Sequence, residues 1–267
     1  SYAVIPLGLA GATGSIQNIS VKEVTDADFQ FSRTSSATRV NPDYLIETVS
    51  INSANLVQNG NFSELGSELV TNGDFATDSD WTKQTGWTIS GGTANYDFLT
   101  NSKYLRQTLL NGGFVSGETY KINFEITEGT AYMNIKSNAE TLESTALYSI
   151  GSYSIYVTAS ANGSDLLIYG LNTQGTAFSI DNVSVKQVDP NDNWTLGTGW
   201  SYGTNKIIHS SGTGSASRLQ QLGLNNTSLY KVTITIINKG ANSYRIFNGA
   251  GSNVILLEGT NTYLVTG

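Results

Sequence analysis

The chain has 267 residues, a formal net charge of −7 and no cysteine. The lack of cysteine excludes disulfides and thiolate metal sites, and the acidic balance argues against a nucleic-acid partner, which would select a basic surface. No apolar run approaches the roughly 18 residues that suggest a membrane span. With 28 glycines and abundant Ser, Thr and Asn, the composition favours an all-β protein that binds neither nucleic acid nor membrane.

The first element is one copy of an internal repeat. GSIQNISVKEV at residues 14–24 returns as FSIDNVSVKQV at residues 178–188, and the match extends back without a gap to Tyr2. The second copy closes a complete repeat, so we expect residues 1–24 to be the C-terminal strands of an incomplete sandwich. Its beginning is missing from the chain.

Both copies break the alternation of apolar residues at the same place. Ile16 and Ile19 have opposite parity, as do Ile180 and Val183. One extra residue at each break would return both side chains to the core, so the pattern predicts a β-bulge in each copy.

Residues 25–66 are expected to form a connecting β segment. FQFSRTSSATRVNPDYLIETVS at residues 29–50 predicts two short strands around an Asn41-Pro42-Asp43 turn. Two near-copies of one phrase follow, LVQNGNF at residues 56–62 and LVTNGDF at residues 69–75.

Residues 67–188 are expected to be a complete jelly-roll sandwich. Residues 120–126 alternate apolar and polar side chains, which places Tyr120, Ile122, Phe124 and Ile126 on one face of a strand. Further short apolar segments follow, with glycine-bearing turns between them. Many short strands at this spacing favour a β-sandwich of jelly-roll type.

Residues 189–267 repeat the start of that module and then stop. Trp194 and Trp200 have the spacing of Trp81 and Trp87, but the copy lacks its last strands. The two ends of the chain are therefore complementary parts of one domain. Either residues 1–24 of one chain complete residues 190–267 of a neighbouring chain, which gives a homo-oligomer or head-to-tail filament, or the sequence is a window on a longer tandem protein.

Two phrases carry a family resemblance. NGDF followed by tryptophan, with FSIDNVSV at the end of the module, resembles the carbohydrate-binding-module jelly rolls found beside polysaccharide hydrolases. FSRTSSATRVNPDYLIETV resembles a phrase of phage virion proteins, especially tail fibres. Together they imply tandem jelly-roll modules in a structural fibre or filament protein of a phage particle.

The resemblance also implies a location on the virion, other virion proteins as partners and a host surface polysaccharide as ligand. Two alternatives stay open: a carbohydrate-binding module or adhesin of a cell-surface or secreted protein, and a capsid decoration protein.

Catalytic chemistry is not expected. The only histidine, His209, lies in a strand-like run without a motif around it, which favours an exposed or edge-strand side chain. Paired carboxylates could serve a glycosidase, but those in the Asn- and Asp-rich loops are more often turn formers. We therefore predict a non-enzymatic protein with no catalytic residues.

A structural calcium ion is the one cofactor that the resemblance implies. Modules of this kind often hold calcium between their first and last strands, and the corresponding residues here are Asn72, Asp74 and Asp181. Calcium requires about six to eight oxygen ligands, so backbone carbonyls and waters would complete the site. The alternative is that Asn72 and Asp74 form a turn and Asp181 caps the bulge.

Sugar binding would require exposed aromatic rings with polar neighbours, since rings stack on pyranose faces and amide or charged groups bind hydroxyls. Core packing is the competing interpretation for each ring, and Trp87 and Trp200 are expected to be core residues. The candidate glycan-binding residues are Trp81, Tyr96, Tyr104, Arg106, Gln107 and Tyr132.

Overall fold

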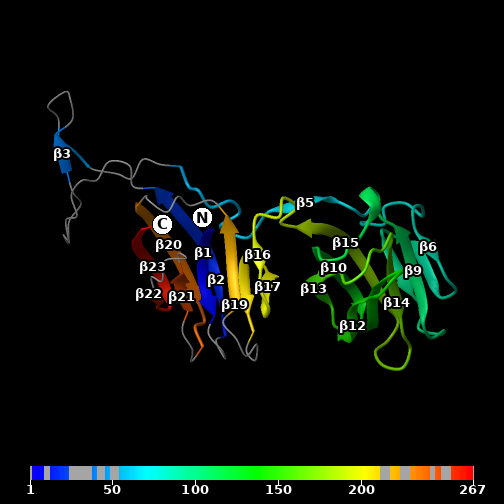
Figure 1. Ribbon diagram of the computed structural model, residues 1–267. Coiled ribbons are helices and arrows are strands. Elements are labelled where there is room, and N and C mark those ends of the chain that lie inside the picture. The colour runs from blue at the N-terminus through cyan, green and yellow to red at the C-terminus, as the bar shows by residue number, and fades with distance from the viewer. Residues whose placement is uncertain are drawn as a thin grey trace. The chain divides into compact units, whose positions relative to one another are not determined.

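The computed structural model describes residues 2–8, 13–23, 38–40, 46–48, 54–210, 217–222, 229–240, 244–247 and 254–266. The chain folds as two compact units (Figure 1): unit 1 comprises residues 1–63 and 191–267, and unit 2 comprises residues 64–190. In the described part, a single 3-10 turn, η1 (Leu110–Gly112), accompanies the strands, and none of its helices is long and apolar enough to cross a membrane. The expected all-β jelly-roll fold is confirmed.

Unit 2 is a sandwich of two antiparallel sheets. Sheet 2a has the order β13 (Gly151–Thr158), β10 (Thr119–Gly129), β15 (Phe178–Val188), β8 (Thr93–Tyr96) and β7 (Trp87–Ser90), with β5 (Leu65–Glu68) also paired to β15. Sheet 2b has the order β12 (Thr141–Tyr148), β11 (Ala131–Ser137), β14 (Asp165–Gly170), β9 (Lys103–Thr108) and β6 (Thr82–Lys83).

Alternating side chains of these strands fill the core between the two sheets. Tyr120, Ile122, Phe124 and Ile126 are all buried, as their parity predicts. Trp87 packs there against Tyr96 and Phe178, at centroid distances of 5.2 and 5.6 Å, and its core position is confirmed.

Unit 1 has the same topology but takes its strands from both ends of the chain. Sheet 1a has the order β17 (Trp200–Gly203), β18 (Lys206–His209), β2 (Gly14–Glu23), β20 (Leu229–Ile237) and β23 (Gly259–Thr266). Sheet 1b has the order β16 (Thr195–Leu196), β19 (Ser217–Leu222), β1 (Tyr2–Gly8), β21 (Tyr244–Phe247) and β22 (Val254–Leu256). The blue strands β1 and β2 thus lie among the yellow-to-red strands in Figure 1.

Comparison of the strand orders shows that β1 and β2 occupy the places of β14 and β15. The strands that end unit 2 therefore begin unit 1, and residues 64–190 are inserted between two parts of unit 1. Within this single chain, the N-terminal strands complete the sandwich formed by the C-terminal segment.

Both predicted bulges are confirmed. The pairing of β2 with β20 shifts between Gln17 and Ser20, and the pairing of β15 with β10 shifts at the equivalent place. The extra residue is an asparagine in both units, Asn18 with φ of 56° and Asn182 with φ of 52°. Asparagine tolerates this left-handed conformation better than most residues do.

The two copies of the NG-containing phrase form the same contact in each unit, which we call the Asn-Gly latch (residues 56–62 in unit 1 and 69–75 in unit 2). The carbonyl of Gly60 accepts the Ile19 N–H at 2.7 Å, and the carbonyl of Gly73 accepts the Val183 N–H at 2.8 Å. The latch therefore binds the bulged strand. Residues 56–62, which the sequence places in the connecting segment, belong to unit 1.

A tryptophan and a glutamine hold each latch. Trp81 donates its indole N–H to the Asn72 carbonyl at 3.0 Å, and Trp194 donates to the Asn59 carbonyl at 3.1 Å. The side-chain oxygen of Gln107 accepts the Thr71 N–H, and its side-chain nitrogen donates to the Thr71 carbonyl. Gln221 makes the same two hydrogen bonds with the backbone of Gln58. These contacts explain why the sequence repeats the Trp spacing.

The expected hairpin in the connecting segment is present, because β3 (Thr38–Val40) pairs antiparallel with β4 (Ile46–Thr48). The predicted turn at residues 41–43 lies outside the described residues, as does most of the phage-like phrase.

The expectation of an exposed or edge-strand His209 is wrong. The side chain is 1% exposed, and its ring centroid lies 4.6 Å from that of Trp200. β18 lies inside sheet 1a, so this side chain belongs to the core.

Candidate functional site

A groove with a volume of about 620 Å³ lies on the outer face of sheet 2b. Strands β9, β11 and β14 form its floor, and the turn after β11 borders it. The lining residues are Tyr104, Arg106, Lys136, Ser137, Asn138, Ala139, Glu140, Thr141, Asp165, Leu167 and Tyr169.

Strand register arranges the floor in cross-strand rows. Leu167 of β14 is opposite Arg106 of β9 and Lys136 of β11. Tyr169 is opposite Tyr104, one row away on the same face, because side chains two residues apart share a face. The rows place an apolar side chain between two cations, beside a pair of tyrosines.

The tyrosine pair forms an aromatic surface. The rings of Tyr104 and Tyr169 have centroids 5.4 Å apart at an interplanar angle of 66°, and both side chains are half-buried. The ammonium of Lys136 lies 4.8 Å from the centroid of the Tyr169 ring, within cation–π range. These contacts restrict the rings while leaving part of each open to a ligand.

An ion pair with a buried carboxylate fixes the arginine of the groove. A guanidinium nitrogen of Arg106 lies 2.9 Å from Asp165 Oδ2, and the Asp165 side chain is 4% exposed while that of Arg106 is 42% exposed. The Thr108 hydroxyl donates to the other Asp165 oxygen at 2.8 Å. The carboxylate therefore holds the guanidinium in one place with donors still open to solvent.

The turn beside the groove is also held. The carboxylate of Glu140 accepts the backbone N–H groups of Ser160 and Ala161 at 2.8 and 3.1 Å, and it accepts the Ser160 hydroxyl. That hydroxyl is the main reason why the pKa of Glu140 is lowered, and the two N–H groups add to the effect. The wall of the groove is thus tied to the connection between β13 and β14.

The sequence-predicted glycan residues divide into two sets. Tyr104 and Arg106 line the groove, and Tyr132 is half-buried elsewhere on β11. Trp81 is 6% exposed against Phe75, and Gln107 is 3% exposed in the latch. Tyr96 is 1% exposed, although it borders a smaller hollow of about 350 Å³. The buried positions of Trp81, Tyr96 and Gln107 leave no ring face or amide for a ligand, so we exclude these three from the candidate site.

Apart from Tyr104 and Arg106, the groove residues are not among those predicted from the sequence; they include Lys136, Asp165, Leu167 and Tyr169. Residues 166–169 are apolar or aromatic throughout, so their composition alone does not separate the two faces of the strand. The parity of Asp165, Leu167 and Tyr169, opposite to that of the buried Leu166 and Ile168, carries the signal that places them on the outer face.

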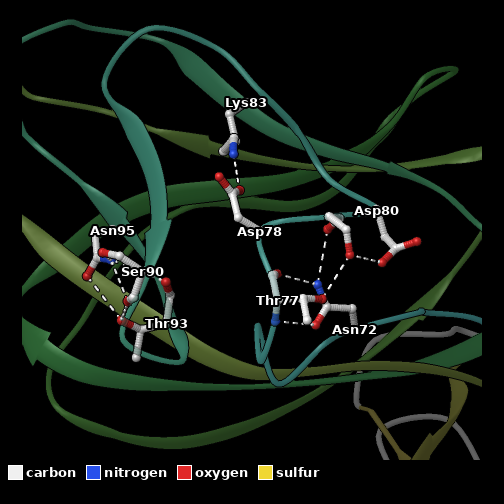
Figure 2. A network of polar contacts seen from close by, with 9 residues as sticks. Asn72, Thr77, Asp78, Asp80, Lys83, Ser90, Thr93 and Asn95 are labelled. Atoms are coloured by element: carbon white, nitrogen blue, oxygen red, sulfur yellow. Dashed lines mark hydrogen bonds and ion pairs between the residues drawn. The ribbon is translucent and has the colours of Figure 1, made fainter.

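The residues expected to bind calcium are only partly brought together. Asn72 turns its amide N–H groups to the carbonyls of Thr77 and Ser79, at 2.8 and 3.0 Å, and so closes its own loop (Figure 2). Burial raises the pKa of Asp181, the nearby carboxylates of Glu125 and Asp74 raise it further, and the Asn182 N–H lowers it.

Among the residues that the structure describes, no group of three His, Cys, Asp or Glu side chains could hold a metal ion. Asn72, Asp74 and Asp181 therefore do not form a ready ligand set by themselves. A calcium ion at this place stays a prediction, which a shift in thermal unfolding between calcium and EDTA would test.

The chain is similar to several solved structures, two of which are carbohydrate-binding modules. One is a CBM35 from Paenibacillus barcinonensis, with 21% identity, coverage of 41% of this chain and 90% of that chain, and a TM-score of 0.28. The other is the CBM22-1–CBM22-2 tandem domain of Xyn10C from the same organism, with 9% identity, coverage of 69% of this chain and 64% of that chain, and a TM-score of 0.34. No protein-family model and no curated protein matches the chain.

Proposed function

We propose that unit 2 is a non-catalytic carbohydrate-binding module that takes a glycan in the groove of sheet 2b. The observation that carries the proposal is the half-buried Tyr104–Tyr169 pair beside the cations of Arg106 and Lys136. A sugar ring has apolar faces and a rim of hydroxyls, so it needs an aromatic or apolar surface with fixed polar groups around it. The groove offers both.

The polar groups suit hydroxyls because they are already oriented. Asp165 holds Arg106 before any ligand arrives, and Glu140 holds the adjacent turn. Fixing these groups in advance lowers the entropic cost of binding. The proposed ligand is an oligosaccharide segment that lies across β11, β14 and β9.

Titration of the full chain with oligosaccharides selected on a glycan array tests this proposal. We expect Tyr169→Ala to weaken glycan binding at least tenfold. The variant loses both the stacking surface and the ring that the Lys136 ammonium contacts. Tyr156→Ala is the matched control, because Tyr156 is a half-buried tyrosine on β13 of the other sheet, under Lys121. Equal losses in both variants, or no glycan bound by the wild type, would refute the proposal.

The assignment to a virion, with partners in the particle, is a further proposal that rests on the sequence resemblance at residues 29–50. Detection of this chain by mass spectrometry in purified phage particles is its test. Binding of a glycan by unit 2 is compatible with a fibre, a decoration protein or a cell-surface adhesin.

A further inference from the structure

Strands β1 and β2 each occupy the middle of a sheet whose other strands come from the far end of the chain. β2 lies between β18 and β20 in sheet 1a, and β1 lies between β19 and β21 in sheet 1b. Without them, both sheets would be split and the neighbouring strands would present unpaired N–H and C=O groups. Unit 1 is therefore a domain with a slot for two strands.

The core of unit 1 depends on the same strands. Ile16, Ile19 and Val21 are 0%, 2% and 0% exposed. The segment 55–60 holds the backbone of β2, because the Gly60 carbonyl accepts the Ile19 N–H at 2.7 Å and Asn55 Oδ1 accepts the Val21 N–H at 2.9 Å. Leaving these apolar side chains exposed to water would be unfavourable, so occupation of the slot is strongly favoured.

The covalent connection does not determine which copy of the chain fills the slot. Residues 24–55 connect β2 to the latch of unit 1, and this connection is several times longer in sequence than those between β13, β14 and β15 of unit 2. The corresponding strands of unit 2, β14 and β15, follow β13 through short connections, which tie them to their own unit. In the part of the chain that the structure describes, the two-strand slot of unit 1 is thus filled by strands that a long connection in sequence joins to the rest of their unit.

We propose that residues 2–23 are an exchangeable donor segment, which completes unit 1 of a second copy of this chain and joins chains head to tail. All contacts of the slot are the same whether the donor comes from the same chain or from another. The tethered donor acts at an effective concentration of roughly millimolar order, so the closed monomer prevails in dilute solution. Exchange increases when chains fold together at high concentration, and each exchanged chain offers a further slot or donor.

Cysteine cross-linking in the otherwise cysteine-free chain tests this directly. Ser20 of β2 and Thr233 of β20 are opposite partners in the register. A full-length Ser20→Cys chain is refolded together with a full-length Thr233→Cys chain at increasing protein concentration, and then oxidised. We expect a disulfide-linked heterodimer whose share rises with concentration.

Two controls make the outcome decisive. Asn123→Cys replaces Thr233→Cys in the first, because Asn123 of β10 has the equivalent position opposite Ser184 in unit 2, where no donor is needed. The second is the double variant Ser20→Cys/Thr233→Cys, which should close its disulfide within one chain when refolded dilute. Exchange is overturned if the double variant closes but the mixed single variants give no more heterodimer than the Asn123→Cys mixture. It is equally overturned if the double variant does not close, since the pairing itself would then be absent.

Discussion

Units 1 and 2 share a backbone design but not an outer surface. The glycine carbonyl of the latch accepts the N–H of the bulged strand at 2.7 Å in unit 1 and 2.8 Å in unit 2. The aromatic pairs that cover the latches, Phe62–Trp194 and Phe75–Trp81, have centroid distances of 5.2 and 5.3 Å. In contrast, the groove residues Tyr104, Arg106 and Tyr169 correspond in strand register to Arg218, Gln220 and Leu7. The two units therefore share the residues of the latch, on which the fold depends, while the residues on the outer face of sheet 2b differ from their counterparts in unit 1.

The cores also differ in one compensating way. The position of Phe178 in unit 2 is taken by Gly14 in unit 1, and a Cβ at Gly14 would lie 2.9 Å from the hydroxyl of Tyr244. The Tyr244 ring thus fills space that a phenylalanine on the bulged strand fills in unit 2. The two sandwiches reach close packing with different residues.

The largest predicted effect tests whether the latches are equivalent. Gly60→Ala and Gly73→Ala would each force a Cβ into a backbone carbonyl, that of Ile19 or Val183, which cannot move without breaking the strand. We expect each substitution to lower the free energy of unfolding of its own unit by about 3 kcal/mol or more. Hydrogen exchange followed by mass spectrometry reads the two units separately. A large loss of stability from only one of the two substitutions would contradict the equivalence of the two latches.

A smaller effect should distinguish the two outer faces. Arg106→Ala leaves the buried Asp165 carboxylate without its cation, and because Arg106 is partly exposed we expect a loss of about 2 kcal/mol in unit 2. Gln220→Ala, at the equivalent place in unit 1, should change stability by no more than about 0.5 kcal/mol. Urea unfolding of both variants measures this, and equal losses would contradict it.

Two buried tyrosines should respond oppositely to removal of the hydroxyl. Tyr120 accepts the Val115 N–H at 2.8 Å and donates to the Gly113 carbonyl, so Tyr120→Phe should cost about 1.5 kcal/mol. The Tyr244 hydroxyl has no hydrogen-bond partner among the described residues, so Tyr244→Phe should leave unit 1 as stable or slightly more stable. Urea unfolding of both variants tests this. If Tyr244→Phe lowered the free energy of unfolding as much as Tyr120→Phe, the Tyr244 hydroxyl would have a hydrogen-bond partner, contrary to the prediction.

The smallest effect concerns alkaline pH, where the units should behave alike. Burial raises the pKa of Tyr244 to about 12, and burial, with Glu143 and Tyr153, raises the pKa of Tyr148 to about 12, from 10.0. The stability that these neutral phenols confer is fully present below pH 10 and is lost as pH rises through 12, because the unfolded chain ionises first. Tyr148→Phe and Tyr244→Phe should each flatten this decline in one unit. Unchanged pH profiles would argue against burial as the cause.

The sequence predicts the sandwich and its bulges because both depend on local alternation, which residues 120–126 and the pair Ile180 and Val183 show directly. It does not predict the role of residues 56–62, since a latch is defined by the distant strand that it binds. The exposure of the aromatic residues is equally hard to predict. The sequence makes Trp81 and Tyr104 equal candidates for sugar binding, but in the folded chain Trp81 is buried and Tyr104 lines the groove. Strand parity and packing against the other sheet determine which ring is exposed.

The stoichiometry of glycan binding to the full chain tests most directly the claim that unit 2 carries the site and unit 1 does not. Isothermal titration should give one glycan per chain, and Tyr104→Ala/Tyr169→Ala should abolish that site while both units stay folded by hydrogen exchange. Two glycans per chain, or one that persists in the double variant, would contradict the account.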